Sequence, residues 1–148
     1  MKISTRGRYG IRMMLVLALH YENGTIPLRS IAKEQGISEK YLEQIVNPLM
    51  KAGIVKSFRG AQGGYTLTNA PDQITVGEIL RILEGSLSPV DCVDHASCPN
   101  ADTCVSLSIW KKMKAALDEV VDSITLADMA KEYAEKNPNL DFLHPCEG

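Results

Sequence analysis

The sequence predicts a mainly α-helical protein with one small β-hairpin, arranged as a winged helix-turn-helix domain followed by a long helix. Three observations predict this fold: two short helical patterns meet at a glycine, a strand–turn–strand pattern follows them, and a long amphipathic pattern comes later. Of the 148 residues 45% are hydrophobic, which is too many for a disordered protein with a net charge of −2. No apolar run approaches the roughly 18 residues of a membrane span. We therefore expect a cytoplasmic protein with no membrane partner.

Three helices are expected at the start of the chain. The first carries apolar residues at helical spacing and stops at residues 22–24. The second covers Leu28 to Gln35 and is ended by Gly36. The third runs from about Glu39 to Ala52, and the hydroxyl of Ser38 can cap it. Two helices joined by a short glycine-containing turn are typical of a helix-turn-helix.

A β-hairpin is expected directly after the third helix. Residues 54–58 have the composition of a strand, residues 59–64 form a glycine-rich turn, and residues 65–67 return. A hairpin in this place makes a winged helix, with Arg59 at the base of the wing. The glycines by themselves indicate only a hairpin turn.

The second half of the chain divides into a helix, a loop and a long amphipathic segment. Thr75 can cap a helix that continues to about Leu83, and residues 86–104 form a loop with little hydrophobic periodicity. A long helix starts near Val105, with an apolar stripe of Leu107, Trp110, Met113, Leu117, Val120, Val121 and Ile124. A homodimer would cover this stripe, although packing on the chain's own domain stays open. A last helix is expected over residues 125–136.

These elements predict four parts. Residues 1–84 form the winged helix-turn-helix domain, residues 85–104 the cysteine-bearing loop, residues 105–136 the dimerisation helix and terminal helix, and residues 137–148 a flexible tail.

Charge is distributed unevenly between the two halves. Residues 1–60 hold ten Lys and Arg against four Asp and Glu, whereas residues 61–148 hold six against fourteen. A basic amino-terminal part on an acidic chain is typical of a protein that binds nucleic acid, although charge alone also allows a merely solvated face.

Four cysteines occur, and all lie beyond residue 91. Cys92, Cys98 and Cys104 form a C-x5-C-x5-C pattern, and Cys146 lies in the tail. Clustered cysteines in a cytoplasmic chain more often bind metal or sense redox state than form structural disulfides. The spacing matches neither the usual C-x2–4-C of structural zinc sites nor the ferredoxin patterns. The spacing alone therefore establishes only that three thiolates lie on one loop.

Several motifs together resemble the Rrf-type winged-helix transcription regulators, whose members include IscR, NsrR and CymR. The similarity lies in residues 1–10, 36–38, 41–44, 55–60 and 63–65, and continues through the three cysteines, Trp110 and residues 124–126. It covers about residues 1–130 and implies a homodimer that binds a roughly palindromic double-stranded DNA operator.

The resemblance also implies which residues contact DNA. Cations can neutralise phosphates, the start of the third helix can contact base edges, and Arg59 suits a narrow A·T-rich minor groove. Glu43 can accept from a cytosine amino group and Gln44 can pair with adenine. The candidate DNA-binding residues are Arg6, Arg8, Ser38, Lys40, Tyr41, Glu43, Gln44 and Arg59.

The IscR-like context implies that Cys92, Cys98 and Cys104 ligate an iron–sulfur cluster, with a 2Fe–2S cluster favoured. Leu107 stands where IscR has its fourth ligand, a histidine, and Arg8 stands where NsrR uses a carboxylate. The fourth ligand is therefore open. The candidates are His95, Asp94, Asp102, His144, Cys146 and an exogenous thiol or water.

The leading hypothesis is a cluster-sensing regulator that controls iron–sulfur cluster biogenesis genes. The alternative is a CymR-like regulator of cysteine metabolism, or a redox- or nitric-oxide-responsive repressor, without a cluster or with a different one. CymR-type chains lack the cysteine trio. An enzyme is not expected, because the chain has no C-x-x-C pair, no phosphate-binding glycine loop and no evident catalytic base.

Overall fold

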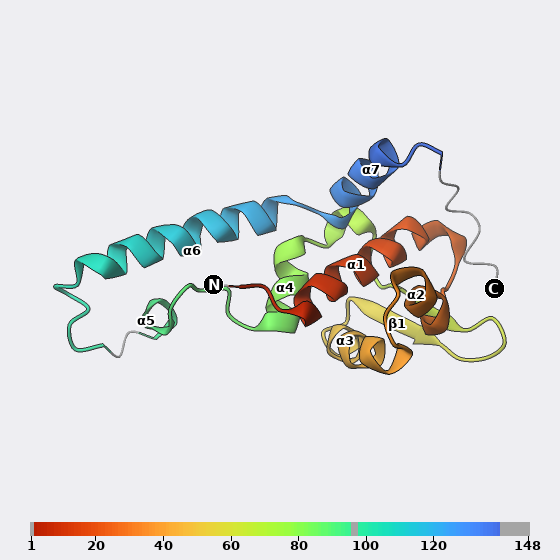
Figure 1. Ribbon diagram of the computed structural model, residues 1–148, viewed down its shortest axis with the longest axis horizontal. Helices are drawn as coiled ribbons and strands as arrows, with labels where there is room; N and C mark the ends of the chain where they lie inside the picture. Colours follow the sequence, from red (N-terminus) through yellow and green to blue (C-terminus); the bar gives the residue numbers. More distant parts are fainter. Residues whose placement is uncertain (1, 96–97, 140–148) are drawn as a thin grey trace.

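The structure, a computed structural model, describes residues 2–95 and 98–139. It is mainly helical with one two-stranded sheet, as the sequence predicts (Figure 1). The elements in order are α1 (Thr5–Leu19), η1 (Tyr21–Asn23), α2 (Leu28–Gln35), α3 (Glu39–Lys51), β1 (Val55–Phe58), β2 (Gly64–Leu67), η2 (Pro71–Gln73), α4 (Val76–Glu84), α5 (Asp91–Asp94), α6 (Val105–Ser123) and α7 (Leu126–Lys136).

One hydrophobic core joins α1, α2, α3, α4 and α7. Each helix turns an apolar side inward, and the most completely buried side chains include Met13, Ile31, Leu42, Ile79 and Leu126. The caps expected from the sequence are present: the hydroxyls of Ser38 and Thr75 each accept a backbone N–H at 3.1 Å. Gly36 ends α2 with a φ of 64°, which favours glycine.

The wing is an antiparallel hairpin that is held against the loop before α2. Its register pairs Val55 with Leu67 and Phe58 with Gly64. Ile26 adds an isolated bridge to β2, because its backbone exchanges two hydrogen bonds with Tyr65, at 3.0 and 2.8 Å. A side chain at Gly64 would collide with the Ile26 backbone, so this close approach requires glycine.

We call residues 85–123 the arm and the other described residues the body. In Figure 1 the arm extends away from α2 and α3, and α5 lies beside the first turns of α6. The chain returns to the body through an antiparallel bridge between Thr75 and Thr125. The short helix α5 interrupts a segment that the sequence predicts as an irregular loop; its four residues are too few to give a periodic signal.

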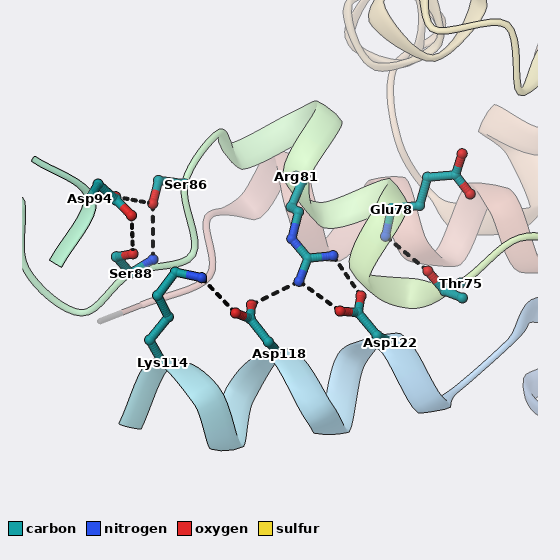
Figure 2. A network of polar contacts seen from close by, with 9 residues as sticks. All are labelled: Thr75, Glu78, Arg81, Ser86, Ser88, Asp94, Lys114, Asp118 and Asp122. Atoms are coloured by element: carbon teal, nitrogen blue, oxygen red, sulfur yellow. Dashed lines mark hydrogen bonds and ion pairs between the residues drawn. The ribbon is translucent and has the colours of Figure 1, made fainter. Parts of the chain in front are cut away.

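A polar cluster fastens the inner half of α6 to α4. The guanidinium of Arg81 bonds to the carboxylates of Asp118 at 2.8 Å and Asp122 at 2.5 Å, and Lys114 bonds to Asp118 at 2.6 Å (Figure 2). Hydrogen bonds from Lys114 and then Arg81 hold the pKa of Asp118 below its usual value. Gly77 lets the helices approach, because a Cβ there would collide with Asp122.

The apolar stripe that the sequence places on α6 is partly buried within the chain. Leu107 and Val121 are buried within the chain, and Val121 packs with Leu80 and Leu87. The prediction that Leu107 and Val121 pack against a second chain is therefore wrong, because both are buried within this chain, Val121 against α4 and the loop after it. An apolar row stays exposed on α6, and it comprises Val105, Ile109, Met113, Ala116 and Val120. Only Met113 and Val120 belong to the predicted stripe.

Candidate nucleic-acid interface and cysteine segment

α3 presents a polar face opposite its buried face. Leu42, Ile45, Val46 and Leu49 pack into the core. Lys40, Glu43 and Gln44 are exposed on the other side, and Asn47 continues this face at helical spacing. The structure thus brings three sequence-predicted residues together on one helix and adds Asn47. Its position one turn after Glu43 was the signal that could have identified it.

Aromatic contacts set the position of α3 against α1. The rings of Tyr9 and Tyr41 meet edge to face with centroids 6.1 Å apart. The Arg12 guanidinium lies 5.3 Å from the Tyr9 centroid, and its Nε donates to the side chain of Gln35 at 2.7 Å. Tyr41 lies in the first turn of α3 and is half-buried in this contact, so part of its side chain packs between α1 and α3.

Further predicted cations lie at the start of α1 and on the wing. Arg6 and Arg8 are exposed in the first turn of α1, and Arg8 donates to the hydroxyl of Thr5 at 3.1 Å. Arg59 is exposed directly after β1. The hydroxyl of Thr25 donates to the carbonyl of Gln62 at 2.8 Å and so ties the wing turn to the body. Exposed cations on a tethered hairpin and on a helix start can meet phosphates without losing an internal ion pair.

The three cysteines of the described residues are free and exposed. Cys92 lies on α5, Cys98 follows it, and Cys104 is the residue before α6. Cys92 and Cys98 line a pocket of about 240 Å³ together with Asp91 and His95. Cys146 and His144 fall outside the described residues.

The donor chemistry of this segment fits a soft metal group, because three thiols are free on one short stretch of chain. Their arrangement is open: among residues 2–95 and 98–139, no three His, Cys, Asp or Glu side chains come together as a metal site. Of the candidate fourth ligands, His95 shares the pocket with two thiols. Asp94 instead accepts hydrogen bonds from Ser86 and Ser88, which lower its pKa, and Asp102 is exposed.

Comparison with known proteins identifies the family. Residues 3–132 match the Rrf2 family, described as an iron-dependent transcriptional regulator. The chain belongs to the Rrf2 family. The resemblance and the winged-helix fold predicted from the sequence are therefore confirmed.

Relatives within the Rrf2 family include two kinds of regulator. The transcriptional regulator CymR of Bacillus subtilis (strain 168) is 47% identical over 130 residues, covering 88% of this chain and 90% of that protein. IscR of Aliivibrio salmonicida (strain LFI1238) is 36% identical over 129 residues, covering 87% and 77%. The solved structure of T. potens IscR is 47% identical, with a TM-score of 0.78, and the match covers 97% of this chain and 96% of that one.

These relatives establish the general activity of the chain. It is a transcriptional regulator of the Rrf2 family, whose members bind DNA and are typically dimeric, and it is not an enzyme. Within residues 2–95 and 98–139, no helix is both long and apolar enough to cross a membrane. Overall identity does not separate the two kinds of regulator, because CymR and the T. potens IscR structure are equally similar to this chain.

Proposed function

We propose that this chain is a homodimeric transcription regulator that senses iron–sulfur cluster status through Cys92, Cys98 and Cys104 and controls cluster biogenesis genes. The observation that carries the proposal is the group of three free, exposed thiols on one segment of an IscR-like chain. A cluster held there would supply a redox- and oxygen-labile group. His95 is the proposed fourth ligand, because it lines the same pocket as Cys92 and Cys98.

DNA recognition is assigned to the exposed face of α3, the start of α1 and the wing. Lys40, Arg6 and Arg8 neutralise phosphates, Ser38 fixes the start of α3, and Tyr41 supports the helix from its half-buried position. Glu43 and Gln44 contact base edges in the major groove. Arg59 enters the adjacent minor groove.

The dimer interface is assigned to the exposed face of α6. Val105, Ile109 and Val120 are 80%, 50% and 55% exposed, which is costly for a row of large apolar side chains in water. A second copy of α6 would cover the row on both chains at once. Two α3 helices related by this symmetry would bind a roughly palindromic operator.

The decisive experiment is purification without oxygen, followed by visible absorbance and by iron and sulfide determination. Brown protein with iron and sulfide bound in proportion to the chain supports the proposal. Colourless protein with one zinc per chain would overturn the cluster proposal and indicate a structural zinc site instead. Selection of binding sites from random DNA, with loaded and cluster-free protein, then gives the operator and shows whether its affinity changes with the cluster.

A second candidate is a CymR-like regulator of cysteine metabolism, favoured by the 47% identity to CymR. This candidate predicts operator binding that is the same with or without iron and sulfide. It also predicts that replacing the three cysteines leaves DNA affinity unchanged.

A further inference from the structure

Polar contacts run from the cysteine segment to the start of α1. Asp94 lies on α5 between Cys92 and Cys98, and its carboxylate accepts from the hydroxyls of Ser86 and of Ser88, the latter at 2.5 Å (Figure 2). These two serines lie in the loop that follows α4. At the last residue of α4, Glu84 accepts from both the backbone N–H and the hydroxyl of Ser4, at 3.1 and 2.5 Å.

Glu84 controls how α1 begins. Ser4 is the N-cap of α1, and its hydroxyl also accepts the backbone N–H of Gly7 at 3.1 Å. The Glu84 carboxylate fills the space beside Gly7, where a Cβ would collide with it. A carboxylate at this end is favourable to the positive end of the helix dipole. The same turn carries Arg6 and Arg8.

The loop between the two contacts is itself anchored. Residues 85–88 connect Glu84 to the serines that Asp94 holds, and within them Leu87 is buried with Leu80 and Val121. The loop is therefore fixed to α4 and α6 instead of hanging free. Only three residues lie between Glu84 and Ser88, so the stretch that joins the two contacts is short as well as packed.

We infer that Glu84 is a positioning residue for DNA binding and that Asp94 connects it to the cysteine segment. Glu84 fixes the N-cap of α1 and thereby the direction of the Arg6 and Arg8 side chains. Asp94 joins α5 to the loop after α4 through its hydrogen bonds with Ser86 and Ser88. The inference rests on the proposed function for its regulatory meaning, because α5 carries both Cys92 and Asp94, so a group bound at Cys92 acts on the same helix that makes the Asp94 contacts.

The test uses the full-length, cluster-free protein and measures hydrogen exchange of residues 2–12 by mass spectrometry. Glu84→Ala removes the two hydrogen bonds that hold the Ser4 cap and should speed exchange there by up to about fivefold, the size expected for complete loss of one cap. Operator affinity, measured on the site selected from random DNA, should fall with it. Glu84→Gln keeps an accepting oxygen and should stay near the parent. Glu78→Ala, an exposed glutamate on another side of α4, is the matched control and should change neither measurement.

The second variant tests the connection to the cysteine segment. Asp94→Ala should speed exchange in residues 2–12 as well as in residues 85–90, whereas Asp91→Ala at the start of the same short helix should not. Unchanged exchange in residues 2–12 of Asp94→Ala would overturn the connection. An equal effect of Glu78→Ala would overturn the role of Glu84.

These outcomes are distinguishable from failure of the proposed function. Parent protein that takes up no iron and sulfide would remove the cluster proposal. The exchange measurement uses cluster-free protein, so it would still establish or overturn the positioning role of Glu84.

Discussion

The body and the arm bury their helices to different extents. In α3, four of 13 residues are buried, and in α6 only two of 19 are. The helix of the body is surrounded by α1, α2 and α4, whereas α6 contacts the body mainly through α4 and the rest of it faces solvent. The difference indicates that the body has a core of its own, while the arm leaves an apolar row of α6 exposed.

The same contrast holds for polar groups. In the body, the exposed cations of α1 and α3 lie on helices whose first turns are capped by serine side chains. In the arm, three free thiols lie on a segment held by α5, the Asp94 contacts and the first turn of α6. In the proposed function, the body contacts DNA and the arm binds the cluster and the second chain.

The largest effect is expected from the cysteines of the arm. Cys92→Ser, Cys98→Ser and Cys104→Ser should each collapse cluster content, because a hydroxyl is a poor ligand for iron in place of a thiolate. Iron and sulfide per chain measure this loss. The thermal unfolding temperature of the cluster-free protein should not change, since all three side chains are exposed.

The control for this prediction is Cys146→Ser, which should keep the cluster. A loss in Cys146→Ser as complete as in Cys104→Ser would point to a site of four cysteines and would overturn the assignment of His95.

The next effect tests whether the exposed face of α6 is what a second chain covers. Met113→Glu should convert the dimer to monomers, because it would bury an unpaired charge in the interface. Sedimentation velocity measures the change, and operator affinity should fall with it because a single half-site contributes too little.

Two adjacent alanines provide a matched pair for this face. Both are exposed, but Ala116 lies in the apolar row and Ala115 points about 100° away from it. Ala116→Glu should weaken the dimer and Ala115→Glu should not. Intact dimers in both Met113→Glu and Ala116→Glu would place the interface on another surface.

A smaller effect is expected in the body. Arg59→Ala should weaken operator binding by roughly 1–3 kcal/mol by removing a cation from the minor groove. Glu43→Ala should instead relax sequence preference, because removing an acceptor also removes repulsion against wrong bases. Fluorescence anisotropy measures the first, and binding-site selection the second. An unchanged consensus for Glu43→Ala would remove its proposed role in base recognition.

The smallest effect is expected where the arm joins the body. The pKa of Asp118 is lowered in the folded protein, so its ionised form stabilises the fold above the unfolded value of about 4, and this contribution disappears as the pH falls through the lower folded value. Asp118→Asn should therefore cost stability at pH 7, by up to about 1 kcal/mol for a partly exposed ion pair. Thermal unfolding of parent and variant from pH 7 to pH 2 should converge at the acid end. A constant difference across that range would contradict this account.

Local features of the chain were predicted well because their causes lie within a few residues. Ser38 and Thr75 accept the N–H groups three residues ahead, and Gly36 adopts the left-handed conformation that ends α2. The wing follows from two short strands and a glycine turn. The candidate DNA-binding face of α3 follows from the period of its apolar residues, which leaves Glu43 and Gln44 outside.

What only the tertiary structure decided depends on residues that are distant in the sequence. The sequence displays one apolar stripe on α6, but packing of Val121 against Leu80 assigns part of it to the chain itself. The exposed apolar row includes Val105 and Ile109, which the predicted stripe left out. Likewise, Ser4 and Glu84 are 80 residues apart, and no local pattern announces their hydrogen bonds. Periodicity determines which side of a helix is apolar, because it depends on the turn of one helix. Which neighbour covers that side is decided by how the helices pack, and this involves the whole chain.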